Sequence, residues 1–277
     1  MDGKFSWKVP EAMEFSGFLL IKQLNSDNRG GCYGPGETAN EITIGANKVP
    51  LKWISPGLKA DVQVKFTVSD GAPEGMGGAF KMVGNLAFEG FTIEEMAAAL
   101  SFGARENYLA AGVRMEFGDY AMAGGVFFGR TCTMDPILLI DPEVAAVLGT
   151  PPFTGAYVYG EARIPVNELI GIPSSCMLKI KIGAGAGVFY FTEGPTYGGK
   201  LVGEVSGEAL CLISINGRMS LVGVRQGSGS SAPMRFNGNG RLSGKVGICR
   251  FCKRFNKSVG VSFNVTNGRI NSPSIRY

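Results

Sequence analysis

Apolar and polar residues alternate along much of this chain, and this alternation is its dominant local signal. From Asp61 to Val68 the even positions are Val, Val, Phe and Val, whereas the odd positions are Asp, Gln, Lys and Thr. A period of two residues places successive side chains on opposite faces of a β-strand, so this segment predicts a strand with one buried and one wet face. The same period recurs in four further segments: Gly112–Tyr120, Ala156–Ile164, Lys200–Glu208 and Ser258–Val265.

Met234–Ile248 is the longest alternating segment. Its odd positions are polar or basic as far as Lys245, and its even positions are apolar residues or glycine. As a single strand it would extend roughly 50 Å at about 3.3 Å per residue, which is longer than usual. Alternatively, the chain turns back at Asn237-Gly238 or Asn239-Gly240, because Asn-Gly suits the positive φ angles of a type I′ turn. The sequence leaves both interpretations open.

Turn signals divide the second half of the chain. Asn216-Gly217 stands between two apolar runs, Ala209–Ile215 and Arg218–Val224, and predicts a two-residue hairpin; Asn267-Gly268 predicts another. Two glycine-rich segments predict turns or loops: Gly194–Gly199 and Gln226–Pro233.

Few segments carry helix signals. Thr92-Ile-Glu-Glu95 is a capping-box pattern followed by good helix formers, so we expect a helix over 92–100. A second helix is expected over Asp141–Gly149, with Asp as N-cap, Pro at the first helical position and Gly at the end. A further helical turn is compatible with Val166–Ile170.

These signals together predict a mainly β protein: an antiparallel meander with long strands and two short helices, arranged as a sandwich or as an open or partly closed barrel. The 42 glycines and 14 prolines also disfavour a helical bundle. Pro151-Pro152 resists helix and central strand and suggests a boundary. We therefore expect a mixed β domain with the helices over 1–150 and a continuous meander over 151–277, or one continuous domain.

Charge is distributed unevenly along the chain. Residues 209–277 carry 11 basic side chains and no Asp or Glu, whereas the first 208 residues carry 16 basic and 23 acidic side chains. Such asymmetry indicates partners rather than fold. The residues expected to form a cationic binding face are Arg218, Arg235, Arg241, Lys245, Arg250, Lys253, Arg254 and Lys257.

The chain has no histidine, which removes Ser-His-Asp and Cys-His catalysis and His-ligated zinc from consideration. Gly194–Lys200 resembles part of a P-loop, but Leu201 replaces the required Ser or Thr and an alternating strand follows. Gly183–Gly187 lacks the last glycine of a dinucleotide fingerprint. We therefore expect a protein that is not an enzyme and has no cofactor.

Six cysteines are too sparse for a disulfide scaffold, and Cys132, Cys176 and Cys211 lie in apolar segments where free buried thiols are expected. Cys249-Arg-Phe-Cys252 is best interpreted as a structural pair, reduced or bridged. A metal site that adds Cys211, and a redox dithiol, are the alternatives.

Three functional hypotheses follow. The first is a structural or assembly module whose cationic C-terminal sheet binds an acidic surface, on a protein partner or on another copy in head-to-tail self-assembly. The second is a β protein that binds anionic lipid or inserts in a membrane as a barrel or pore. The third, nucleic-acid binding, depends on charge and on Phe251 and Phe255 among the bases. No signal-peptide pattern and no apolar run of membrane-spanning length occur, and the compartment stays unassigned.

Overall fold

A computed structural model covers residues 1–277. It describes all of them except residues 1, 10–12, 26, 28–31, 51–58, 70–75, 89–90, 104, 170–177, 194, 211, 228–231, 248–251 and 268.

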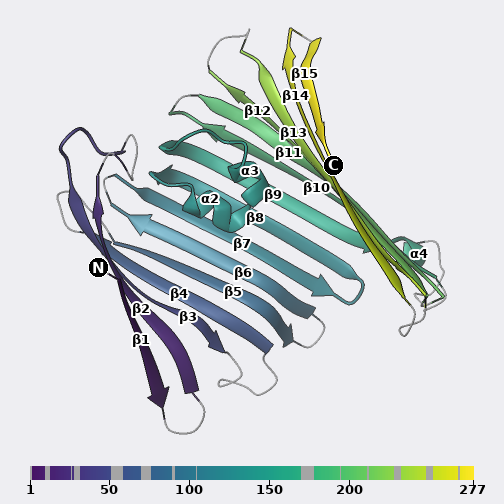
Figure 1. Ribbon diagram of the computed structural model, residues 1–277, viewed down its shortest axis with the longest axis horizontal. Coiled ribbons are helices and arrows are strands. Elements are labelled where there is room, and N and C mark those ends of the chain that lie inside the picture. Colours follow the sequence, from purple (N-terminus) through teal and green to yellow (C-terminus); the bar gives the residue numbers. More distant parts are fainter. Residues whose placement is uncertain are drawn as a thin grey trace. The chain divides into compact units, whose positions relative to one another are not determined.

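The described residues form fifteen β-strands that hydrogen bond in chain order, β1 to β15, within one sheet (Figure 1). The first eight are β1 (Asp2–Val9), β2 (Met13–Leu24), β3 (Ala39–Pro50), β4 (Lys59–Ser69), β5 (Met76–Phe88), β6 (Phe91–Phe102), β7 (Asn107–Phe117) and β8 (Tyr120–Thr131). The remaining seven are β9 (Phe153–Pro165), β10 (Leu178–Phe191), β11 (Thr196–Ala209), β12 (Ile213–Gln226), β13 (Met234–Val246), β14 (Lys253–Thr266) and β15 (Arg269–Arg276).

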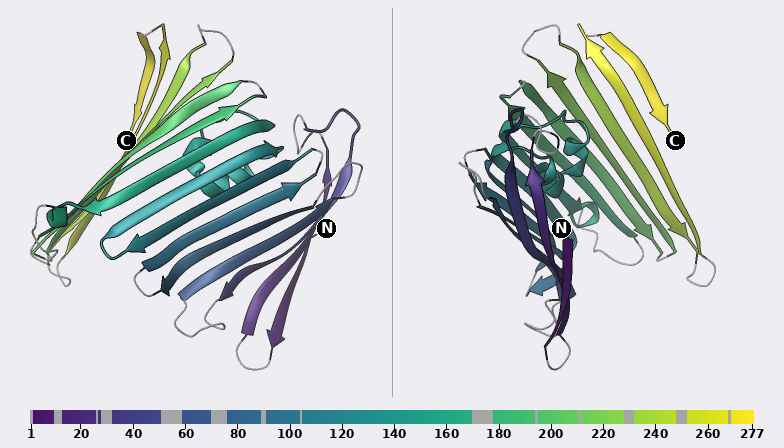
Figure 2. Two further views of the ribbon diagram at one scale, coloured as in Figure 1. Left: turned by 180° about the vertical axis from the view of Figure 1, so that it is seen from behind. Right: turned by 60° about the vertical axis from the view of Figure 1, so that its left-hand side comes forward.

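This topology confirms the predicted antiparallel meander. The strand order begins at β1 and ends at β15, so these two are the edge strands and the sheet is open. Figure 2 shows β10 to β15 as long neighbouring strands.

The described part of the chain also contains three short helices: α2 (Asp135–Ile140), α3 (Pro142–Ala145) and α4 (Val166–Leu169). The carboxylate of Asp141 accepts hydrogen bonds from the backbone N–H groups of Glu143 and Val144, at 3.0 and 3.1 Å, and so caps α3. The helix expected over 141–149 is thus confirmed, although it is shorter, and α4 confirms the helical turn near 166. No sequence signal predicted α2.

The helix expected over 92–100 is wrong, because these residues belong to β6. In the register, Ala97 lies opposite Gly112, and the side chain of Ile140 in α2 lies 3.4 Å from the position where a Cβ at Gly112 would stand. Ala97 and Ala99 are buried on the same side of the strand. Alanines here provide room for a helix to pack on the sheet.

The hairpin expected at Asn216-Gly217 is also wrong. β12 runs straight through this dipeptide, with Asn216 between Ser206 of β11 and Ser243 of β13. The chain turns earlier, at Leu210–Leu212, where Leu210 has a φ of 53° and the N–H of Leu212 donates to the carbonyl of Ala209. Pairing on both sides therefore overrides the local turn preference of Asn-Gly.

Other strand predictions hold. β13 is one strand over its whole length, so Met234–Val246 does not fold back at either Asn-Gly pair. Thr266 pairs with Arg269, which confirms a two-residue turn at 267–268. Four of the predicted alternating segments lie within strands: Asp61–Val68, Ala156–Ile164, Lys200–Glu208 and Ser258–Val265.

The chain divides into two compact units. Unit 1 comprises Met1–Glu116, Gly124–Tyr157 and Phe191–Glu193, and unit 2 comprises Phe117–Ala123, Val158–Tyr190 and Gly194–Tyr277. The domain boundary expected at Pro151-Pro152 stays a prediction.

In unit 1, α2 and α3 lie over one face of β7 and β8 (Figure 1). Below them the side chains of Phe127, Tyr157 and Phe191 are fully buried. The hydroxyl of Tyr157 donates a hydrogen bond to the buried carboxylate of Asp141, which joins the strands to the start of α3. We call this side of unit 1 the helix-side face.

A disulfide closes unit 1, where free thiols were expected. Cys132 is bonded to Cys32, 100 residues away, so the expectation for Cys132 is wrong. The two cysteines are buried with Leu24, Tyr33 and Ala39. Sequence spacing cannot reveal such a pair, because the register of six intervening strands brings the two residues together. Cys176 and Cys211 lie outside the described residues.

A guanidinium reinforces the disulfide. Arg105 Nη1 donates to the carbonyl of Cys32 and to Glu37 Oε2, each at 2.7 Å, and its guanidinium lies over the ring of Tyr33. The hydrogen bond from Arg105, with a further one from the N–H of Gly34, lowers the pKa of Glu37 below its ordinary value.

Candidate functional site

The register of unit 2 sorts the side chains of β11–β14 into two faces of opposite character. One, the polar face, carries Lys200, Glu204, Ser206, Glu208, Ser214, Asn216, Arg218, Ser220, Arg235, Asn237, Asn239, Arg241, Ser243, Lys245, Arg254, Asn256, Ser258, Ser262 and Asn264, together with three valines, Val202, Val222 and Val224. The other, the apolar face, carries Leu201, Val205, Ile213, Ile215, Met219, Leu221, Met234, Phe236, Leu242, Val246, Phe255, Val259, Val261, Phe263 and Val265.

Many side chains of the apolar face are exposed. Met219 is 70% exposed and Leu201 is 62% exposed, whereas Lys200 and Ser220 of the polar face are buried. The buried part of the polar face also includes Val202, Val222 and Val224, so the sheet buries some apolar side chains but leaves the larger apolar side exposed. The apolar face is therefore a large surface that needs an apolar environment.

Unit 1 shows the same arrangement. Ile44, Phe66 and Leu100 are in register on one face and are all exposed. Thr43 and Ser101, which lie on the opposite, helix-side face, are buried. In both units, then, one face of the sheet exposes large apolar side chains, and the opposite face buries both polar and apolar ones.

Glycines on β13 let large side chains of β14 lie flat on the apolar face. A Cβ at Gly244 would stand 2.3 Å from the ring of Phe255, and one at Gly240 would stand 2.9 Å from Val259. These positions require glycine because of close approach, and the result is a smooth apolar surface.

Ion pairs connect strands across the polar face. Arg218 contacts Glu161 of β9 through two hydrogen bonds, at 2.9 and 3.2 Å, and Glu204 at 3.5 Å. Arg163 pairs with the same Glu204 at 3.1 Å. Lys200 lies over the ring of Tyr159, 4.7 Å from its centroid. The charges nearest β9 are thus balanced by carboxylates.

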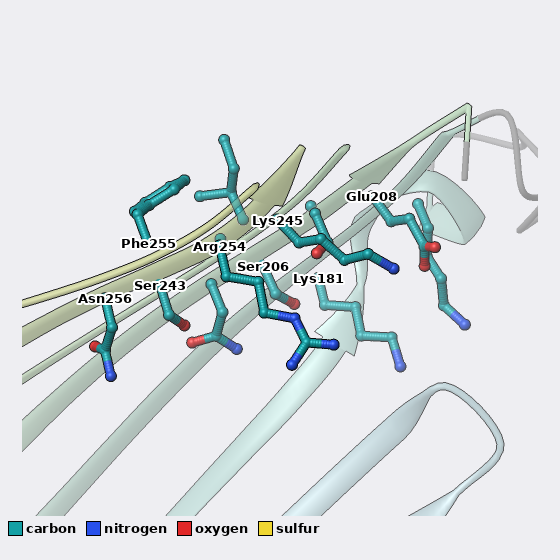
Figure 3. A pocket seen from close by; sticks show the side chains of 14 residues that line it. Lys181, Ser206, Glu208, Ser243, Lys245, Arg254, Phe255 and Asn256 are labelled. Atoms are coloured by element: carbon teal, nitrogen blue, oxygen red, sulfur yellow. The ribbon is translucent and has the colours of Figure 1, made fainter. Parts of the chain in front are cut away.

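Further along the polar face, basic side chains surround a hollow of about 610 Å³ (Figure 3). Its polar lining comes from five strands: Lys179, Lys181, Ser206, Glu208, Ser214, Asn216, Ser243, Lys245, Arg254 and Asn256. In Figure 3, Lys181, Lys245 and Arg254 extend from the same side of the strands, and Phe255 points to the other side. Asp119 pairs with both Lys179 and Lys181.

The structure distributes the eight predicted basic residues over both faces. Arg218, Arg235, Arg241, Lys245 and Arg254 lie on the polar face. Lys253 and Lys257 lie on the apolar face, opposite Val246 and Leu242. Arg250 lies outside the described residues.

Sequence reasoning missed Lys179 and Lys181, which contribute to the hollow from β10. Both precede the acid-free segment, so a search for charge excess passed over them. The alternation Leu178-Lys-Ile-Lys-Ile182 was a signal that could have identified them.

Other predicted sites are placed less completely. Lys200 of the P-loop-like segment belongs to strand β11, as the alternation predicts, and its side chain is buried. Cys249 and Cys211 lie outside the described residues, so the predicted pair of Cys249 with Cys252 and the metal site that adds Cys211 stay predictions. Within the described ranges no group of three or more Cys, Asp or Glu side chains is arranged to hold a metal ion.

The aromatic and basic residues near 250–255 do not form one surface. Phe255 belongs to the apolar face and Arg254 to the polar face, and Phe251 lies outside the described residues. No helix among the residues placed here is long and apolar enough to cross a membrane.

Comparison of the chain with family models, curated proteins and solved structures finds no significant match.

Proposed function

We propose that this chain is a membrane-inserted β protein, with its apolar face against lipid hydrocarbon and its polar face toward water. The observation that carries the proposal is the exposed apolar face: in unit 2, Leu201 and Met219 are exposed, whereas Lys200 on the opposite face is buried. Water disfavours such a surface at about 25 cal/mol per Å², whereas hydrocarbon accepts it. Strands that alternate apolar outside and polar inside are typical of membrane β proteins.

The strand lengths support the same proposal. On β12 the apolar face runs from Ile213 to Gly223, which is about the 9–11 residues that a tilted strand needs to cross a bilayer. Tyr197 and Arg225 follow at one end, with the guanidinium near the ring. Aromatic and cationic side chains suit the interface between hydrocarbon and water. Lys253 and Lys257 can extend their ammonium groups out of the apolar region in the same way.

The polar face supports the proposal through its ion pairs. Arg218 is satisfied by Glu161 and Glu204, and the hollow near Lys245 is lined by hydroxyl, amide and charged groups. Such a face is suited to contact with water, as on the inner side of a membrane-embedded sheet. An anionic bilayer surface would also attract the basic strand ends.

Arginine substitution at matched depths tests this function. We expect Met219→Arg to destabilise the protein folded into phosphatidylcholine vesicles by about 2–4 kcal/mol, because an arginine on the lipid face is costly. Asn239→Arg is the matched control, since it lies one residue away in the register but on the polar face, and should cost less than about 0.5 kcal/mol. Denaturant unfolding in vesicles measures both.

Equal, small effects of the two substitutions would contradict lipid contact. So would a protein that stays monomeric in detergent-free buffer and fails to co-sediment with vesicles. Either result would indicate that the apolar face binds a protein partner and not lipid.

A second candidate function is self-assembly through strand edges and charge. Strand β15 is exposed over its whole length and has no neighbour beyond it in the strand order. Unpaired edges attract further strands, and a sheet within hydrocarbon must have its edges paired. Copies of the chain could also meet through the acidic first 208 residues and the basic end.

Sedimentation at low salt and near 1 M salt tests this second candidate. Salt shortens the Debye length to about 3 Å near 1 M, so charge-driven association should decline. Reversal of Arg235, Arg241 and Lys245 to Glu changes only the polar face of β13 and should reduce association without loss of β structure. Association unaffected by both changes would exclude a charge-driven contact.

A further inference from the structure

Two basic residues of the polar face oppose each other directly. Lys245 of β13 and Arg254 of β14 are partners in the register. Side chains in such pairs have Cβ atoms about 4.5–5.5 Å apart, and like charges there destabilise the sheet. The same row continues through Ser214 to Glu208, an acid two strands from Lys245. Lys245 and Arg254 therefore place two like charges side by side on the polar face.

The surroundings of this pair add positive charge and hydrogen-bond donors. Lys179 and Lys181 line the same hollow, and Asp119, which pairs with both, supplies a single carboxylate. The neighbouring row on the same face is Ser206, Asn216, Ser243 and Asn256. It brings hydroxyl and amide groups next to the basic pair.

Arg254 differs from the other arginines of the polar face. Arg218 is held by two carboxylates, Arg235 donates to Gln226, and Arg241 donates to Asn256. The guanidinium of Arg254 is exposed and has no hydrogen-bond or ion-pair partner among the residues that the structure describes. Its donors are therefore directed at the hollow or at solvent.

We infer that the hollow binds the phosphate group of a phosphorylated ligand. Arg254 presents a planar fork that matches two phosphate oxygens, and Lys245 supplies a point charge beside it. Ser243, in the next row, supplies a hydroxyl donor. A phosphate bound here places negative charge beside both Lys245 and Arg254. It therefore reduces the repulsion between them.

The size of the hollow sets the class of ligand. A volume of about 610 Å³ is within the range of small-molecule sites and exceeds a free phosphate ion. The ligand is thus a phosphate ester, either soluble or the headgroup of a lipid. This assignment concerns the polar face alone and does not depend on lipid contact at the apolar face.

Calorimetric titration of the full chain at low salt tests the site with two probes. Glycerol 3-phosphate represents a soluble ester, and phosphatidic acid in phosphatidylcholine vesicles represents a lipid headgroup. We expect saturable binding of at least one probe, weakened about 10- to 100-fold by Lys245→Gln with Arg254→Gln, because each loses a charge-assisted contact. Binding of the soluble probe identifies a soluble ester, and binding of the vesicle probe alone identifies a headgroup.

Arg276→Gln is the matched control, since Arg276 is an exposed arginine of β15 outside the hollow. It should leave binding unchanged. Thermal unfolding without ligand provides a second measurement, in which the double variant should be at least as stable as the original chain because the repulsion is removed.

Three results would overturn the assignment. They are absence of saturable binding to both probes, equal weakening by Arg276→Gln, and inorganic sulfate competing as well as phosphate. The first two would identify a solvated basic surface, and the third would identify an unselective anion site.

Discussion

Unit 1 and unit 2 both expose an apolar face of the sheet, but the opposite face is covered in different ways in the two units. In unit 1 the helix-side face is covered by α2 and α3, above small residues such as Ala97 and Gly112. In unit 2 the polar face carries ion pairs around Arg218 and opens into a hollow near Arg254. The helix-side face of unit 1 is therefore shielded from water by packed helices. The polar face of unit 2 is stabilised by ion pairs and by contact with water.

This difference predicts different sensitivities. Packing and a disulfide make the stability of unit 1 depend on covalent closure and on buried hydrogen bonds. Ion pairs with partly exposed side chains make the stability of unit 2 depend on salt. Three substitutions test this contrast.

The largest effect is expected from loss of the disulfide in unit 1. Replacing Cys32 and Cys132 by Ser frees a loop of 100 residues, for which chain entropy predicts a loss of about 4.7 kcal/mol. Trp7 lies on β1 of unit 1, so the tryptophan fluorescence of the chain should report the shifted unfolding transition. Amide exchange should rise in unit 1 before unit 2. If the unfolding transition of the original chain is unchanged under reducing conditions, the disulfide does not contribute to the stability of unit 1.

The next effect is expected from Tyr157→Phe. The change removes a hydrogen bond to the buried carboxylate of Asp141, which caps α3, and should cost about 1.5–3 kcal/mol. Tyr190→Phe is the control, since that side chain is exposed and should change stability by less than about 0.5 kcal/mol. Equal costs for both variants would mean that the helices do not depend on this contact.

A smaller, salt-dependent effect is expected in unit 2. Arg218→Gln breaks the contacts with Glu161 and Glu204, whose side chains are partly buried, and should cost about 1–2 kcal/mol at low salt. A double-mutant cycle with Glu161→Gln isolates the pair, and its coupling should fall near 1 M salt. A coupling energy that does not change with salt would mean that the contact between Arg218 and Glu161 is shielded from solvent, like the packed contacts of unit 1.

The sequence predicts the strands well because alternation is local information. It identifies which residues share a face, as for Arg235, Arg241 and Lys245 on β13. It cannot tell which face is buried, since both faces have the same period. The usual assumption that the apolar face is buried fails for Met219 and Phe66.

The wrong predictions have a common cause, which is tertiary pairing. Ala97 suits a helix by propensity but serves the approach of α2, and Asn216-Gly217 suits a turn but is paired on both sides. Cys132 meets Cys32 only through the register of many strands. The hollow was found in part, because charge counting identified Lys245 and Arg254 but not Lys181.

Strand order that equals chain order bears on how the sheet grows during synthesis. Each new strand can pair with the one completed just before it, so the chain closes only short loops as it extends. The carboxylates of Glu161 and Glu204 are made before Arg218, and no acid follows Glu208. Strand β12 therefore brings Arg218 to an edge where its counter-charges, Glu161 and Glu204, are already in place.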